Sequence, residues 1–101
     1  MEKIRLWFVY EEVINKSEKF SKTTWEVIRL INKLEKFYDK NILDLRAIEY
    51  ERFILEHKNI AVDKKNLPVT LLNKKIFFIK ELPSIEELNQ KIVKLRQKGA
   101  K

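Results

Sequence analysis

The feature that most constrains this chain is the dipeptide Leu67-Pro68, which stands directly before two short apolar runs. The runs are Val69 to Leu72 and Ile76 to Ile79, and the turn between them, Asn73-Lys74-Lys75, is so short that the runs must pair antiparallel. Because proline has no N–H to donate to a ladder, it is confined to edges, strand starts and special turns. The sequence therefore predicts a defined turn followed by a β-hairpin.

The N-terminal half predicts a strand, a helix and a second strand. Lys3 to Tyr10 is apolar, aromatic and β-branched, which is typical of a central strand buried on both faces. After a charged connector, Glu11 to Phe20, the spacing of Thr23 and Glu26 predicts a capping box that starts a helix. Its wide apolar stripe predicts packing against a sheet. Ile42 to Ala47 then fits a strand that returns parallel to the first.

The remaining elements complete a small single domain. Glu49 to His57 shows one apolar helical face, and Ile60 to Asn66 is a basic loop that ends at the proline. Ser84 and Glu87 have the spacing of a second capping box, which predicts a third helix. The expected order is β-α-β-α-β-β-α, an α/β fold with a four-stranded mixed sheet and three helices. We expect residues 1–95 to form the domain and residues 96–101 a frayed basic tail.

This order, with Leu67-Pro68 directly before the third strand, resembles the thioredoxin and glutaredoxin superfamily from Ile4 to Leu95. The stretch from Leu67 to Phe78 is similar to the family's cis-proline strand, hairpin and final strand. The resemblance implies a cis peptide bond before Pro68. Most small glutaredoxin-like proteins have threonine directly after this proline, whereas this chain has Val69.

The absence of cysteine removes the usual chemistry of that superfamily. The resemblance places Ser21-Lys22-Thr23-Thr24 where the family carries Cys-x-x-Cys, and the chain contains no cysteine at all. Hydroxyl groups cannot exchange disulfides near neutral pH. The one histidine, His57, has no recognisable nucleophile as partner. We therefore expect a non-redox protein that is not an enzyme and needs neither cofactor nor metal.

The composition indicates a globular, basic protein. It is 45% apolar with one glycine and two prolines, and its formal net charge is +7. The abundance of lysine, glutamate and isoleucine is typical of heat-adapted proteins. The apolar N-terminal run is far too short to cross a bilayer, so we expect a cytoplasmic protein without a membrane partner.

A basic rim is the predicted binding site. If the resemblance holds, the start of the first helix and the loop before the proline lie at one end of the sheet. Unpaired amides at a helix N-terminus attract anions, and lysines strengthen that attraction. Phe20 or Trp25 is available for stacking. The predicted binding residues are Lys16, Lys19, Ser21, Lys22, Thr23, Thr24, Lys64, Lys65 and Pro68.

The expected function is that of a non-catalytic thioredoxin-like binding module with an anion-attracting rim. It is expected to be a protein-interaction or regulatory domain whose partner is another protein or a second copy of the chain. Partners are expected across the cis-proline groove or at the exposed edge of the last strand, Ile76 to Ile79, where a homodimer is also plausible. The alternative is a small basic nucleic-acid-binding protein, with either a phosphate-binding rim or a winged-helix architecture. A strand at Ile42 to Ala47 parallel to the first strand favours the thioredoxin-like architecture, and a helix or turn there favours the winged helix.

Overall fold

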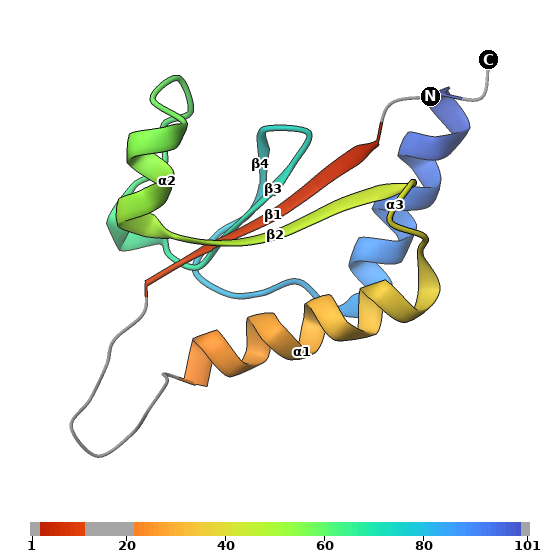
Figure 1. Cartoon of the computed structure of the whole chain (residues 1–101), viewed down its shortest axis with the longest axis horizontal. Coiled ribbons are helices and arrows are strands. Elements are labelled where there is room, and N and C mark those ends of the chain that lie inside the picture. The colour runs from red at the N-terminus through yellow and green to blue at the C-terminus, as the bar shows by residue number, and fades with distance from the viewer. Residues whose placement is uncertain (1–2, 12–21, 100–101) are drawn as a thin grey trace.

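Four strands form one mixed sheet with the lateral order β2-β1-β3-β4 (Figure 1). The computed structural model describes residues 3–11 and 22–99. The strands are β1 (Ile4–Tyr10), β2 (Leu43–Glu49), β3 (Val69–Leu72) and β4 (Lys75–Phe78). β1 pairs parallel with β2 and antiparallel with β3, and β3 pairs antiparallel with β4. The predicted class, α/β with a mixed four-stranded sheet, is confirmed.

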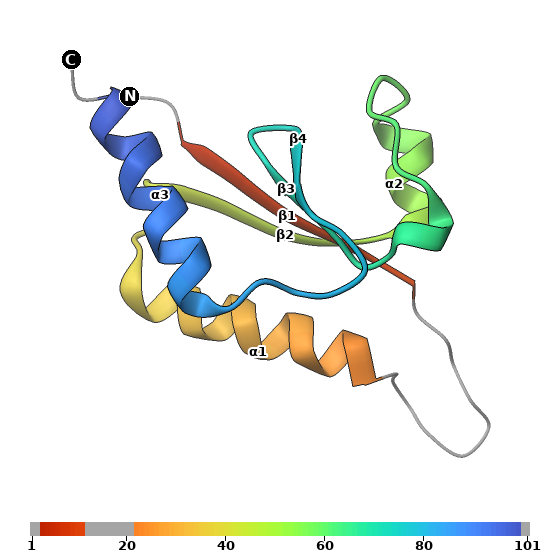
Figure 2. The same cartoon turned by 180° about the vertical axis from the view of Figure 1, so that it is seen from behind.

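Helices cover both faces of this sheet. Within the described residues there are three α-helices, α1 (Lys22–Phe37), α2 (Tyr50–Glu56) and α3 (Ile85–Gly99), and a short 3₁₀ helix, η1 (Lys64–Asn66). α1 and α3 pack on one face and α2 on the other (Figures 1 and 2). Because β2 is a strand parallel to β1, the alternative winged-helix architecture is wrong.

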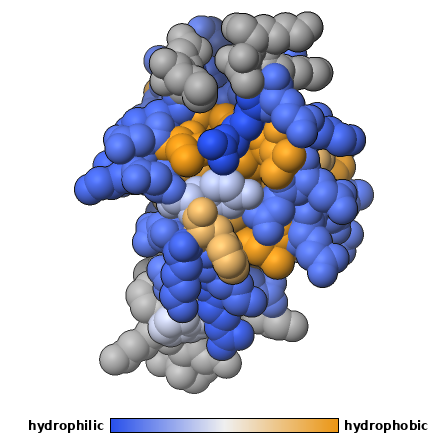
Figure 3. All heavy atoms as spheres, turned by 90° about the vertical axis from the view of Figure 1, so that its right-hand side faces the viewer, coloured by the Kyte–Doolittle hydropathy of each residue, from blue (hydrophilic) through white to orange (hydrophobic). Residues whose placement is uncertain are grey.

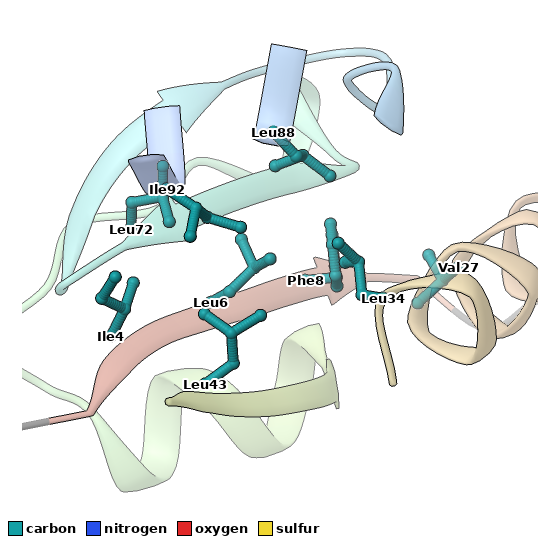
Figure 4. Packing of buried hydrophobic residues seen from close by; sticks show 9 residues of the cluster. All are labelled: Ile4, Leu6, Phe8, Val27, Leu34, Leu43, Leu72, Leu88 and Ile92. Carbon is teal, nitrogen blue, oxygen red and sulfur yellow. The ribbon is translucent and has the colours of Figure 1, made fainter. Parts of the chain in front are cut away.

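The larger core lies between the sheet and the pair α1 and α3. Alternate residues of β1 point into it, since successive side chains of a strand face opposite sides. Figure 4 shows these side chains meeting residues from both helices and from the neighbouring strands. The buried residues of this core are Ile4, Leu6, Phe8, Val27, Leu34, Leu43, Leu72, Leu88 and Ile92.

The second core lies on the face that α2 covers. It takes Trp7 and Val9 of β1, so β1 is buried on both faces, as its mostly apolar sequence predicts; Arg5 is exposed. From α2 only Phe53 is buried. The remaining buried members come from β2, β3 and the loop before β3, and they are Ile48, Val62, Val69 and Leu71.

The turn chemistry around the hairpin follows the sequence closely. The Leu67–Pro68 bond is cis, as the resemblance implies, and β3 has the predicted bounds. Asn73 and Lys74 both have positive φ, 50° and 69°, which a two-residue hairpin turn of this hand requires. Asn73 also donates its backbone N–H to the Arg5 carbonyl at 2.8 Å and accepts from the Arg5 N–H through Oδ1 at 2.9 Å. The turn is therefore tied to β1.

Helix boundaries differ from the predictions at some ends. α1 begins at Lys22, one residue before Thr23, the residue that the sequence predicts as its cap. The serine cap of the second capping box is confirmed, because the Glu87 N–H donates to Ser84 Oγ at 3.1 Å. The Glu87 carboxylate accepts from the Ser84 hydroxyl at 3.2 Å, in place of the backbone N–H that a full capping box uses. α3 continues to Gly99, through part of the segment predicted to be a frayed tail.

Candidate functional site

The predicted rim is only partly within the described residues. Lys16, Lys19 and Ser21 lie outside them, as does Phe20. Lys22, Thr23 and Thr24 form the start of α1, and Lys64 and Lys65 belong to η1, which directly precedes Leu67 and the cis Pro68. The start of α1 and the η1 loop lie toward the same end of the long axis of the molecule (Figures 1 and 2). Trp25 is 49% exposed on α1.

The two lysines of η1 have acidic neighbours. Lys64 Nζ lies 3.6 Å from Glu11 Oε1, and Lys65 Nζ lies 3.6 Å from Asp63 Oδ2. All four side chains are largely exposed, so each pair contributes little to stability. The carboxylates nevertheless offset much of the positive potential at this place. The η1 part of the rim is therefore a mixed surface of both signs, and not a cluster of uncompensated cations.

The loop that carries these lysines is held in place by one side-chain cap and one backbone hydrogen bond. Asp63 caps η1, because its Oδ1 accepts the Lys65 N–H at 3.1 Å. The carbonyl of Asn66 accepts the Lys80 N–H at 2.7 Å, which ties the loop to the residues just after β4. The residues before the cis proline and those after the hairpin thus form one continuous surface.

A shallow groove of about 420 Å³ lies on this surface, beside β4, on the face of the sheet that α2 covers. Two of its walls are apolar side chains of the hairpin strand and the residue after it, Ile76 and Ile79, which are 53% and 40% exposed. Both are large aliphatic side chains at the surface of the protein. The groove, called here the β4 groove, is lined by Tyr50, Ala61, Val62, Asp63, Asn66, Val69, Ile76 and Ile79.

β4 forms an open edge of the sheet next to this groove. It pairs with β3 on one side, and no strand of the described residues pairs with its other side. Three exposed lysines, Lys74, Lys75 and Lys80, stand at its two ends, and the segment 73–80 contains no acidic residue. None of these lysines forms an ion pair with the described part of the chain. We call this strand with its three lysines the basic edge.

The predicted exposed edge at the last strand is confirmed, but the lysines beside it and the β4 groove were not predicted. The basic residues of the hairpin turn are visible in the sequence. These residues lie beside an open edge because β4 is the outermost strand, and that position is known only from the lateral strand order. Seen from the end of the molecule that carries α3, the surface shows apolar patches between polar side chains (Figure 3). Apolar surface is therefore not confined to the β4 groove.

His57 contributes to packing. Its ring lies against Trp7, with centroids 4.7 Å apart, and against Phe53, with centroids 5.0 Å apart. Its Nε2 is buried and has no hydrogen-bond partner among the described residues. The backbone N–H of His57 donates to the Phe53 carbonyl and ends α2. These contacts make His57 part of the second core.

Among residues 3–11 and 22–99, no three His, Asp or Glu side chains converge in a way that could hold a metal ion. None of the helices in these ranges has the length and apolar character that crossing a bilayer requires. No protein-family model, curated protein or solved structure matches the chain.

Proposed function

We propose that this protein is a non-catalytic, thioredoxin-like binding module that binds an extended, acidic and partly apolar segment of a protein partner. The observation that carries the proposal is the basic edge: an open strand flanked by Lys74, Lys75 and Lys80, beside a groove lined by the exposed Ile76 and Ile79. The segment adds a strand to β4 and places its apolar side chains in the β4 groove.

The physical basis is strand addition. An open edge offers unpaired N–H and C=O groups, which a second extended chain satisfies, while pockets for alternate side chains supply the specificity. Lysines at both ends of β4 favour acidic residues in the arriving segment and increase its rate of association. The same lysines oppose pairing with other basic chains, as natural edge strands commonly do.

The family part of the proposal rests on topology. The element order and the cis bond before Pro68 agree with what the resemblance implies. Since the chain has no cysteine, the proposal includes no redox step. The η1 part of the predicted rim lies next to the basic edge, because the Asn66 carbonyl accepts the Lys80 N–H. Its mixed charges favour a protein partner over a phosphate backbone.

The experiment measures binding of a short fluorescent peptide of alternating valine and glutamate by anisotropy. We expect the peptide to bind the natural chain and to bind a Lys74→Glu, Lys75→Glu, Lys80→Glu variant roughly tenfold or more weakly, because three attractive charges become repulsive. The matched control reverses three exposed lysines on the helices, Lys33, Lys36 and Lys94. The control has the same net charge as the variant, so it separates the local effect from the overall charge.

Equal weakening in both variants, or no binding of the peptide, would contradict the proposal. The same chains are titrated with a single-stranded oligonucleotide at several salt concentrations. Tight oligonucleotide binding with a steep loss of affinity in salt, together with no peptide binding, would replace the proposed function by nucleic-acid binding.

A further inference from the structure

The sheet has a second open edge, on β2, which the sequence did not indicate. β2 is the outermost strand opposite to β4, is seven residues long, and pairs on one side with β1. In the described residues no strand pairs with its other side. Natural proteins protect such edges with lysine, proline, bulges or very short strands. The sequence of β2, LDLRAIE, has neither lysine nor proline, and its pairing with β1 is regular over the whole strand.

The hydrogen bonds to β1 determine which groups of β2 are free. The Ile4 N–H donates to the Ile42 carbonyl at 2.9 Å, while Ile4 is opposite Leu43 in the parallel register. In a strand, the N–H and C=O of one residue point to the same side, and the side alternates from residue to residue. The residues whose backbone groups point outward are therefore Leu43, Leu45, Ala47 and Glu49.

We propose that β2 pairs antiparallel with β2 of a second copy of this chain, about a two-fold axis through Leu45. The sheets of the two copies then form one continuous sheet. Leu45 of one copy exchanges both backbone hydrogen bonds with Leu45 of the other, and Leu43 does the same with Ala47 of the other copy. All these residues have outward-pointing backbone groups. The unpaired groups of the edge are thereby satisfied.

Charge complementarity selects this register. With the axis at Leu45, Asp44 of each copy is opposite Arg46 of the other. Asp44 and Arg46 of the two copies form a pair that does not share backbone hydrogen bonds. Opposing side chains come closest in pairs of this kind. Both residues lie on the same face of the sheet, and Arg46 Nε is already 3.2 Å from Asp44 Oδ1 within one chain. In the dimer each carboxylate has two guanidinium groups beside it.

The four nearest registers that satisfy the backbone lack this match. An axis at Asp44 places Asp44 opposite itself, and an axis at Arg46 places Arg46 opposite itself. An axis at Leu43 brings Arg46 opposite Lys40, and an axis at Ala47 pairs no opposite charges. Self-pairing of β4 is disfavoured too, because it brings the three lysines of the basic edge beside those of a second copy. The second copy is therefore assigned to β2, and the proposal is independent of the function of β4.

The test is a charge exchange read by sedimentation equilibrium over a range of chain concentrations. The natural chain is expected to reach twice the mass of one chain, and Asp44→Arg and Arg46→Asp are each expected to remain at the mass of one chain. The double variant Asp44→Arg, Arg46→Asp should dimerise again. An equimolar mixture of the two single variants should also form a dimer, because each charge then finds its opposite.

Two exposed residues of α3 supply matched controls, Glu86→Arg and Arg96→Asp, which change the net charge by the same amounts and should leave the dimer intact. Because Arg46 also lies over the Trp7 ring, 5.7 Å from its centroid, circular dichroism checks that each variant is folded. If a single variant is unfolded, Ala47→Pro takes its place in the sedimentation experiment. This variant is expected to remain at the mass of one chain, because proline removes an outward N–H at an exposed edge position. A monomeric natural chain, or dimeric single variants, would overturn the proposal.

Discussion

Thr70 is the polar side chain most fully enclosed by the described residues. It is 0% exposed, on the face of β3 that packs toward α1 and α3, and its Oγ1 has no hydrogen-bond partner in the described part of the chain. An enclosed hydroxyl without a partner has lost its hydrogen bonds to water without compensation. This residue is therefore a place where the natural sequence is not at its stability optimum.

We expect Thr70→Val to raise the free energy of unfolding by about 1 kcal/mol, because valine has the same shape without the desolvated hydroxyl. Urea denaturation followed by circular dichroism measures the change. The control is Thr70→Ser, which keeps the hydroxyl and loses a methyl group, and which should lower the stability by about 1 kcal/mol. A stabilised serine variant or a destabilised valine variant would show that Oγ1 is bonded.

At the scale of elements, α2 depends on a single side chain. Phe53 is its one buried residue, in contact with the His57 ring, whereas Ile54 and Leu55 are 41% and 71% exposed. A helix of seven residues is far too short to be stable by itself. Its position on the sheet therefore comes from Phe53 and the ring of His57 that follows it.

We expect Phe53→Ala to lower the free energy of unfolding by about 3–5 kcal/mol, the usual cost of removing a buried aromatic ring. The matched control, Leu55→Ala, removes an exposed side chain of the same helix and should change the stability by less than about 0.5 kcal/mol. Thermal or urea unfolding of both variants measures this. Similar losses in the two variants would contradict the packing described for α2.

Elements whose signals are local could be predicted from the sequence. β3 and the Ser84 cap depend on neighbouring residues and lie where proline and serine predict them. The hairpin turn is one residue shorter than predicted, because Lys75 already pairs with Leu72, and β4 is Lys75–Phe78 instead of the predicted Ile76 to Ile79. β2 was predicted as Ile42 to Ala47 but extends to Glu49, because Ile48 is 7% exposed and packs in the second core. η1 was not predicted, since its one capping contact, from Asp63 to the Lys65 N–H, is a weak sequence signal.

The candidate surfaces depended on information that a single sequence does not hold. Which strands are outermost follows from how they order laterally, and that order identified β2 as an open edge. The salt bridge of Lys64 with Glu11 joins residues far apart in the chain, so the sequence predicted a purely basic rim where the structure has both signs.

At the scale of the whole molecule, the two open edges differ in charge. The net charge of +7 belongs to the whole chain. The charged residues of the basic edge at β4 are all lysines, whereas the charged residues of β2 are Asp44, Arg46 and Glu49. Opposite edges of one sheet can thus hold different occupants at the same time. We infer that a dimer through β2 presents two basic edges at the far ends of one continuous sheet.

The most direct measurement of the central claim is backbone hydrogen exchange of the natural chain with and without the valine–glutamate peptide. If the peptide adds a strand to the basic edge, the amides of β4 that point away from β3 gain protection on binding, while amides of β2 exchange at unchanged rates. Protection that appears on β2 or at the start of α1 but not on β4, or no change at a saturating peptide concentration, would contradict the claim.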